Sequence, residues 1–241
     1  MTTILSVFDL NDAWFATLKE VMKNGRTYTV EKGSFEGTQR RQLDTLVLRV
    51  SHPSVRPLAP TVPTGVPAPT SEEYIERYAA QYLLSPDVSP QEEYTYGERL
   101  HEQLLAAIER LQRTPKSNQV CLEAAQPNDF WIADPPCLRL IQFQVREKQL
   151  DMYCYFRSWD VWAGLPTNLG GLQLVKEFVA GECNLMDGEL WAFCPGAHLY
   201  DYSWELAIAR LGKVFENCLG FPPRLSPGHL QNLERTHPGH L

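Results

Sequence analysis

Two neighbouring apolar stretches constrain the fold of this chain more than any other feature. Residues 138–146 and 150–157 both read as strands in which apolar side chains alternate with others. Only Glu147-Lys148-Gln149 separates them, and so short a polar connection indicates an antiparallel hairpin. The alternating pattern is also compatible with a sheet that is covered on both faces.

Helices and further strands are expected around this hairpin. Helical spacing of apolar residues and stop signals such as Gly25 mark the helices, and short alternating runs mark the strands. Thr70 and Glu73 form a capping-box pattern. The predicted helices are 11–23, 70–84, 97–113, 168–182 and 202–217, and the further strands are 45–50, 119–125 and 189–194. With no internal repeat, this mixture predicts an α+β fold, with a mostly antiparallel or mixed β-sheet and flanking helices.

A proline-rich stretch interrupts the early part of the chain. Residues 53–70 contain six prolines, which fix φ and remove backbone donors, so the stretch is predicted to be an extended surface crossing. A linker between two domains would have the same composition. Because about 50 preceding residues make a marginal independent domain, we expect a single domain over residues 1–241. Residues 221–241, rich in proline, histidine and polar side chains, are expected to form a flexible tail.

Composition narrows the classes of function. The 241 residues carry a net charge of −7 and no cluster of lysine and arginine, which argues against a nucleic-acid polymer as partner. The six cysteines form no CxxC pair and no spacing suited to zinc, so we expect no metal. We find no signal peptide and no apolar run of membrane-spanning length. The expectation is a cytoplasmic protein with free thiols, or one in the host-cell cytoplasm if it is viral.

An ordered set of reactive and polar residues follows the second half of the chain. Cys137 stands after two prolines at the head of a predicted strand, and Arg157-Ser158 ends the next one. A thiolate is a strong nucleophile when a nearby cation lowers its pKa, and a guanidinium beside a hydroxyl suits a phosphate. Further along stand side chains that can read a polar ring or a sugar hydroxyl: Asp160, Asn168, His198 and Tyr200. Taken singly, each residue is more often structural: a core cysteine, a surface ion pair, a turn or a cap.

The order and spacing of these residues resemble the thymidylate synthase family. The resemblance covers residues 94–205 well and the N-terminal part loosely. Its closest runs are Tyr94-Thr-Tyr96-Gly-Glu-Arg99, Pro135-Pro136-Cys137, Arg157-Ser158-Trp159-Asp160, Gly164-Leu-Pro166-Thr-Asn168 and His198-Leu-Tyr200. It implies the family's large mixed sheet, packed against a second copy in a homodimer, with a pyrimidine monophosphate and a folate as ligands.

The resemblance also implies a role for each matching residue. Cys137 would add to C6 of the pyrimidine, so that C5 attacks the methylene carbon of 5,10-methylenetetrahydrofolate or a related pterin. Arg157 and Ser158 would hold the 5′-phosphate, and Asp160 would position the base. Asn168 would read the pyrimidine edge, His198 and Tyr200 the sugar 3′-hydroxyl, and Tyr96 would help remove the C5 proton through bound water. Arg40 or Arg41 could be the mobile phosphate arginine, and the sequence does not choose between them.

Asn168 and the departures from the family's motifs bear on the substrate and the product. Uracil presents an acceptor and a donor that one carboxamide satisfies, so Asn168 favours dUMP over dCMP. The family's pair of partner-reaching arginines is replaced by Asn118-Gln119, and its catalytic glutamate could be Glu72, Glu73 or Glu76. The apolar tail that closes over folate in the synthases is polar here, which admits water and favours 5-hydroxymethylation of dUMP. The alternatives are a thymidylate synthase, a dCMP or CMP hydroxymethylase, and a nucleotide-binding protein without turnover.

Overall fold

The computed structural model describes residues 1–33, 35–62 and 67–212, so the predicted tail 221–241 lies outside the described residues. The strands are β1 (Thr2–Val7), β2 (Arg26–Thr29), β3 (Gln39–Gln42), β4 (Thr45–Val50), β5 (Cys121–Glu123), β6 (Leu138–Arg146), β7 (Gln149–Phe156), β8 (Trp159–Asp160), β9 (Met186–Cys194) and β10 (Ala197–Tyr200). The helices are α1 (Leu10–Asn24), α2 (Glu72–Tyr78), the π-helical turn η1 (Ala79–Leu84), α3 (Tyr96–Arg113), the 3₁₀ turns η2 (Pro127–Trp131) and η3 (Asp201–Ser203), α4 (Gly164–Glu182) and α5 (Trp204–Leu211).

The described strands form two β-sheets. The larger sheet has the order β1-β4-β9-β7-β6-β5 and mixes parallel with antiparallel pairs. The smaller one has the order β2-β3-β10-β8. Because β1 pairs with β4 and β4 pairs with β9, strands from the first 50 residues join the same sheet as strands from the second half of the chain. The predicted single α+β domain with a mixed sheet is therefore confirmed.

The predicted hairpin is present with a tighter turn than expected. β6 and β7 pair antiparallel from Leu138↔Phe156 to Arg146↔Gln149, which leaves only Glu147 and Lys148 in the turn. Both residues have positive φ, at 52° and 70°, as a two-residue turn of type I′ requires. The right-handed twist of the strands thus sets a turn that neither side chain favours by itself.

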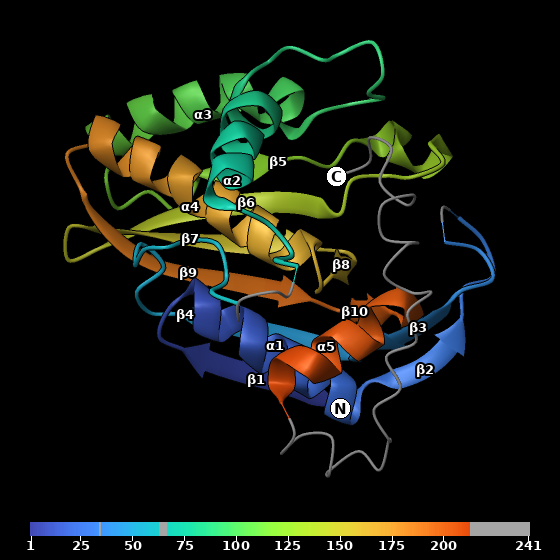
Figure 1. Cartoon of the computed structure of the whole chain (residues 1–241). Helices are drawn as coiled ribbons and strands as arrows, with labels where there is room; N and C mark the ends of the chain where they lie inside the picture. Colours follow the sequence, from blue (N-terminus) through green and yellow to red (C-terminus); the bar gives the residue numbers. More distant parts are fainter. Residues whose placement is uncertain (34, 63–66, 213–241) are drawn as a thin grey trace.

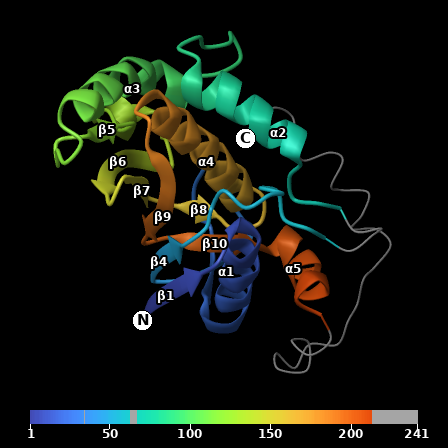
Figure 2. The ribbon, with the colours of Figure 1, turned by 90° about the vertical axis from the view of Figure 1, so that its left-hand side faces the viewer.

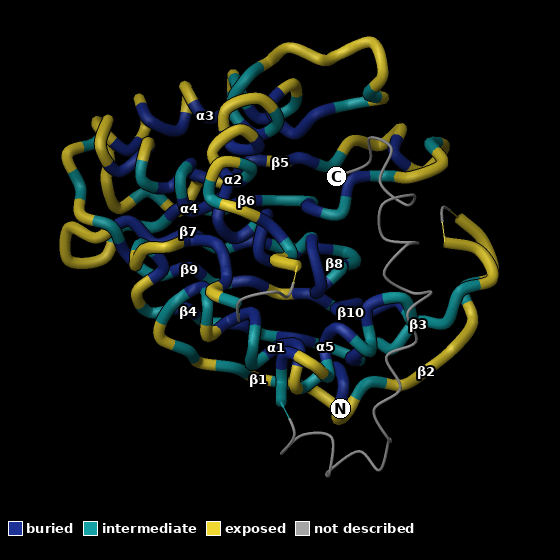
Figure 3. The backbone as a smooth tube through the Cα atoms, in the orientation of Figure 1, coloured by how far each residue is buried: buried dark blue, intermediate teal, exposed yellow. Residues whose placement is uncertain are grey.

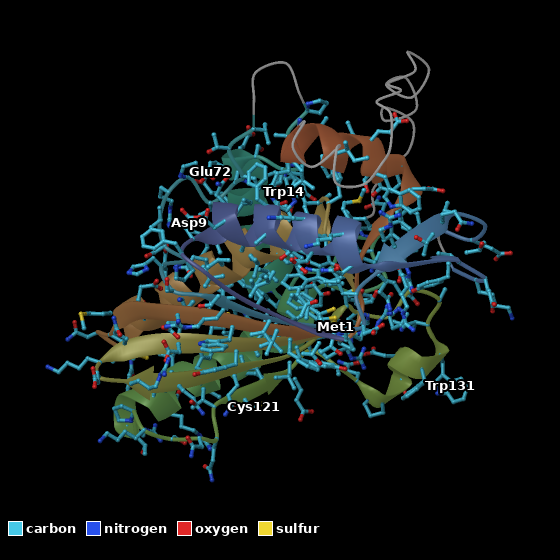
Figure 4. The ribbon with its side chains drawn as sticks, turned by 90° about the horizontal axis from the view of Figure 1, so that it is seen from below. Met1, Asp9, Trp14, Glu72, Cys121 and Trp131 are labelled. Carbon is cyan, nitrogen blue, oxygen red and sulfur yellow. The ribbon has the colours of Figure 1, made fainter. Side chains whose placement is uncertain are left out.

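Local capping shifts several predicted helix boundaries. α1 begins before Asn11 because Asp9 caps it, accepting a hydrogen bond from the backbone N–H of Asp12 at 2.8 Å (Figure 4). The capping box at Thr70 was wrong: Ser71 is the N-cap and accepts from the backbone N–H of Tyr74 at 3.1 Å. The last predicted helix is shorter within the described residues, since a 3₁₀ turn precedes α5, and its predicted end at residue 217 lies beyond them.

The helices cover one side of the larger sheet. In Figure 2, α1, α2 and α4 all lie on the same side of the strands, and α3 lies beside the edge strand β5. The core between these layers is apolar, and the tube view shows it as a band of buried residues behind exposed loops (Figure 3). Part of the proline-rich crossing joins it, because Leu58 and Ala59 are buried. The described residues of the crossing form neither helix nor strand (Figure 1).

The glycine pair in α4 allows this helix to pack closely against its neighbours. A Cβ on Gly171 would lie 2.7 Å from Cδ1 of Tyr78 and 2.9 Å from Cδ1 of Leu83, and a Cβ on Gly170 would meet Ile75 at similar distances. Glycine weakens a helix in isolation. Here its lack of a side chain lets α2 and η1 lie directly against α4.

This close packing makes a prediction for two substitutions in one helix. We expect Gly171→Ala to lower the free energy of unfolding by about 1–3 kcal/mol, because the added methyl overpacks against Tyr78 and Leu83. Gly181→Ala is the matched control, since nothing lies within 4 Å of a Cβ at that position. It should raise the free energy of unfolding by up to about 1 kcal/mol through helix propensity alone. Urea unfolding measures both, and stabilisation by both variants would contradict the close-packing argument.

Candidate active site

The smaller sheet gathers polar side chains on one face. His198 on β10 pairs with Asp160 on β8, and Tyr200 pairs with Arg40 on β3. Directly paired residues point to the same side of a sheet, so these four side chains share a face. Arg40 donates to the hydroxyl of Tyr28 at 2.6 Å and also hydrogen-bonds Tyr200.

Arg41 lies on the opposite face of the same strand. It pairs with Leu199, donates to the carbonyl of Met22 at 2.8 Å, and has its guanidinium 5.1 Å from the ring centre of Trp204. Of the two arginines that the sequence offered, Arg40 is therefore the one beside His198 and Tyr200.

Cys137 lies where the larger sheet meets the smaller one. It directly precedes β6, and its carbonyl accepts a hydrogen bond from the backbone N–H of Arg157 at 2.8 Å, directly after β7. The next backbone N–H, that of Leu138, donates to the hydroxyl of Tyr96 at 3.0 Å. Tyr96 is buried at the start of α3, so this contact fixes the backbone beside the thiol.

Burial has the largest effect on the pKa of the Cys137 thiol. Burial raises its pKa above the usual value, and the carboxylates of Asp134 and Asp160 act in the same direction. The cation of Arg157 lowers the pKa, as expected from the sequence, and Arg139 helps. The cost of burying a thiolate is the larger effect, so the pKa remains raised.

Arg157 is held against the loop that carries the cysteine. Its Nε donates to the carbonyl of Pro136 at 3.1 Å, and its Nη2 donates to the carbonyl of Pro135 and lies 3.6 Å from Asp134. Ser158 follows it and is partly buried. Arg157 and Ser158 thus lie together at the junction between β7 and β8.

A buried ion triad, which the sequence analysis missed, holds the same loop from the other side. Asp129 on η2 is 3% exposed and binds Arg99 and Arg139, each at 2.8 Å. The two guanidinium groups compensate the buried carboxylate and lower its pKa, against the opposing effect of burial. At the outer end of η2, Trp131 lies on the edge of the molecule (Figure 4).

Only one ring nitrogen of His198 has a hydrogen-bond partner among the described residues. Its Nδ1 is 2.8 Å from the carbonyl of Gly196, and a carbonyl only accepts, so Nδ1 carries the proton. Nε2 is buried and has no hydrogen-bond partner among the described residues. Burial lowers the pKa of His198 to about 3, so the ring is neutral and Nε2 is a pure acceptor.

Asn168 and Asp160 lie on either side of the start of α4. The side-chain oxygen of Asn168 accepts from the indole N–H of Trp159 at 2.9 Å, and its nitrogen donates to the hydroxyl of Tyr78 at 2.8 Å. The carboxylate of Asp160 accepts from the backbone N–H groups of Trp162 at 3.0 Å and Ala163 at 3.4 Å. Both side chains thus have defined orientations before any ligand binds.

The inward-facing polar residue of α2 is a tyrosine and not a glutamate. Tyr78 is buried and reaches Asn168, whereas Glu73 and Glu76 are exposed, and Glu72 binds the backbone N–H of Ala59. Helical spacing from buried Ile75 would have identified Tyr78, but a tyrosine on an apolar stripe gives no signal of its own.

A cavity beside Tyr78 could hold a planar ligand. It has a volume of about 440 Å³ and is lined by Tyr74, Tyr78, Tyr82 and Arg77 among others. Tyr82 also contacts Tyr96 edge to face, with ring centres 5.4 Å apart, so the cavity adjoins the residues around Cys137. For metals, the described part of the chain contains no group of three or more histidine, cysteine or acidic side chains that could bind an ion.

Comparison with known proteins gives the family. Residues 67–219 match the family described as thymidylate synthase. The chain belongs to the thymidylate synthase family. It is 30% identical to a protein of Methanosarcina acetivorans over 84% of this chain and 92% of that one, and 30% identical to one of Methanosarcina barkeri over 82% and 89%. A protein of Methanothermobacter marburgensis is 28% identical over 84% and 95%, and all three carry the name "Putative thymidylate synthase".

Two departures from the thymidylate synthase pattern have a structural explanation. Gly196 replaces the usual aspartate, and a Cβ there would lie 3.2 Å from the carbonyl oxygen of Arg157, so glycine allows the two chain segments to approach. In place of the arginine pair, Gln119 accepts a hydrogen bond from Arg110 at 2.6 Å, and Asn118 binds Gln142 through its carbonyl.

Among the described residues, no helix is long and apolar enough to cross a membrane.

The raised pKa of Cys137 predicts how the thiol reacts with pH. Because burial holds the pKa of Cys137 above its usual value, the thiolate fraction should still be rising between pH 8 and pH 9, and alkylation by iodoacetamide should accelerate in proportion. The rate is read from the mass of the peptide that contains Cys137, which separates it from the other cysteines. A plateau below pH 8 would mean that Arg157 outweighs burial, and would contradict the prediction.

Proposed function

We propose that this protein transfers a one-carbon unit from 5,10-methylenetetrahydrofolate, or a related pterin, to C5 of dUMP through a covalent bond between Cys137 and C6. The observation that carries the proposal is the junction of the two sheets, where Cys137 and Arg157 are hydrogen-bonded neighbours beside the polar face of Asp160, His198 and Tyr200. A nucleophile, a cation and sugar-reading groups are the parts that such a reaction needs.

The nucleotide would be held at both ends. Arg157, Ser158 and Arg40 would bind the 5′-phosphate, with Arg40 released from Tyr28 to reach it. His198 would accept a hydrogen bond from the 3′-hydroxyl, since Nε2 is a buried acceptor without another partner among the described residues. Tyr200, 4.8 Å from His198 between ring centres, would complete the sugar contact.

The chemistry would proceed through the pyrimidine ring. The sulfur of Cys137 forms a bond to C6, and the electron pair of the C5–C6 double bond moves toward O4. Asn168 retains one N–H after its bond to Tyr78, and donating it to O4 would stabilise the developing negative charge. Tyr96 would help remove the C5 proton through bound water, and Asp160 would keep the base in place. When Cys137 leaves, the double bond is restored.

The folate would occupy the tyrosine-lined cavity next to this site. When bound, methylenetetrahydrofolate supplies the carbon that C5 attacks. Its flat ring suits the aromatic walls formed by Tyr74, Tyr78 and Tyr82, and Arg77 suits a carboxylate at its other end.

For the product we favour 5-hydroxymethyl-dUMP. Asp134, an exposed carboxylate beside Arg157 and three residues before Cys137, would keep water close to the reacting carbon. Once the bond between the transferred carbon and the folate breaks and tetrahydrofolate leaves, C5 would carry an exocyclic methylene group. Addition of that water to the methylene would give a hydroxymethyl group, whereas hydride from tetrahydrofolate would give a methyl group and leave dihydrofolate. The methyl product, dTMP, is the second candidate, favoured by the names of the relatives. A dCMP or CMP hydroxymethylase is disfavoured by Asn168.

Product mass tests the proposal directly. Incubation with dUMP and methylenetetrahydrofolate should add CH2O to the nucleotide and release tetrahydrofolate, whereas addition of CH2 with dihydrofolate released would identify a thymidylate synthase. Cys137→Ser should lower turnover about a thousandfold or more while dUMP still binds. Cys121→Ser, which changes an exposed cysteine on β5, is the matched control and should turn over normally. Binding without any product in the wild-type protein would indicate the non-catalytic alternative.

We also propose that two copies pack through the open face of the larger sheet. Register places an apolar row across this face from one strand to the next: Ile4, Val47, Phe193, Tyr155 and Leu140. Ile4 is 73% exposed and Phe193 40% exposed. A row of this kind on an uncovered sheet is typical of an interface.

Light scattering tests the assembly. The wild-type protein should have the mass of two chains, and Phe193→Asp should shift it to the mass of one, because a charge in the centre of the row loses its hydration in the dimer. Leu105→Asp is the control: it places the same charge on an exposed apolar residue of α3 and should leave the dimer intact. A wild-type mass of one chain would contradict the assembly.

A further inference from the structure

Trp159 is a buried residue whose single polar atom has one fixed direction. Its side chain is 1% exposed and stacks on Phe156, with ring centres 4.0 Å apart and planes 6° apart. It pairs with Ala197 in the smaller sheet, so it points away from the face that carries His198 and Asp160. The indole N–H therefore reaches the side-chain oxygen of Asn168, at 2.9 Å, from behind.

The two partners of Asn168 are not equivalent. An indole N–H can only donate, so it can face only the oxygen of the carboxamide. The hydroxyl of Tyr78, on the other side, can donate or accept and would satisfy either end of the amide. Trp159 alone therefore determines which way round the carboxamide lies, and Tyr78 follows.

The fixed orientation leaves one acceptor and one donor site for a ligand. The oxygen of Asn168 keeps a second lone pair, the nitrogen keeps a second N–H, and the residue is only partly buried. Uracil offers an acceptor at O4 and a donor at N3, which this arrangement matches. Cytosine offers the reverse pair, an amino donor and a ring acceptor, and would need the carboxamide turned over.

We propose that Trp159 is a positioning residue that makes this site selective for uracil over cytosine nucleotides, by holding the carboxamide of Asn168 in one orientation. The inference rests on the proposed function, because it takes Asn168 as the reader of the base. It adds a residue that contacts no ligand itself, and it explains why a carboxamide that could otherwise turn over discriminates between the two bases.

The test compares equilibrium binding of dUMP and dCMP to the full-length protein and its variants by calorimetry. Trp159→Phe removes the N–H and keeps an aromatic ring against Phe156, so both amide orientations become possible. We expect affinity for dCMP to rise and the preference for dUMP to fall about tenfold or more, as for loss of one well-oriented bidentate contact to a base. Tyr78→Phe should keep the preference, even if both nucleotides bind less tightly, because Trp159 still holds the oxygen.

Two further variants separate selectivity from stability. Trp204→Phe removes an indole N–H that donates to the carbonyl of Leu199 at 3.1 Å, away from Asn168, and should leave the ratio of affinities unchanged. If Trp159→Phe does not fold, benzothienylalanine at position 159 replaces only the N–H by sulfur and keeps the ring size. A rise in dCMP affinity is informative because loss of structure cannot produce it.

Each outcome bears on one proposal or the other. A wild-type protein that binds neither nucleotide would remove the proposed function. A wild-type preference for dUMP that survives removal of the Trp159 N–H would overturn the role of Trp159 and leave the proposed function standing. Loss of preference in Tyr78→Phe but not at position 159 would also overturn it, as would equal affinity of the wild-type protein for the two nucleotides.

Discussion

Two short connections between strands lie against each other, and the rest of the site depends on this contact. One runs from β7 to β8 and the other from β9 to β10, and the backbone N–H of Trp159 donates to the carbonyl of Gly196 at 3.1 Å between them. Gly196 allows this approach because it has no Cβ. Both connections carry the chain from the larger sheet into the smaller one, so residues far apart in sequence come together at the start of β6, which Cys137 directly precedes.

The side chains around this junction have their hydrogen-bonding roles assigned before a ligand arrives. The carbonyl of Gly196 accepts a hydrogen bond from the protonated nitrogen of His198, and the indole N–H of Trp159 donates to the oxygen of Asn168. What remains toward the ligand is an acceptor in the first case and an ordered donor and acceptor in the second. Such preorganisation lowers the cost of orienting polar groups during binding and reaction.

Sequence reasoning succeeded where a single pattern determined the structure. The hairpin of β6 and β7, the strand β4 and the helix α3 follow from periodicity and short connections. It missed β2 and β3, whose residues are polar or exposed, because they become strands only through the pairing of β2 with β3 and of β3 with β10. Within the site, the ordered motif identified the residues around Cys137. The partners that orient them, such as Tyr78 and Asp129, are fixed by tertiary packing, which no local pattern reports.

The neutral ring of His198 has a consequence for where in metabolism this protein would act. With its pKa lowered to about 3, the ring cannot become a cation at physiological pH, and Nε2 can only accept a hydrogen bond. A free sugar hydroxyl can donate that hydrogen bond. A phosphodiester at the same position has no hydroxyl to donate and brings negative charge to a buried acceptor. Under the proposed function, a base inside a DNA strand would therefore be excluded, and modification of the nucleotide would precede polymerisation.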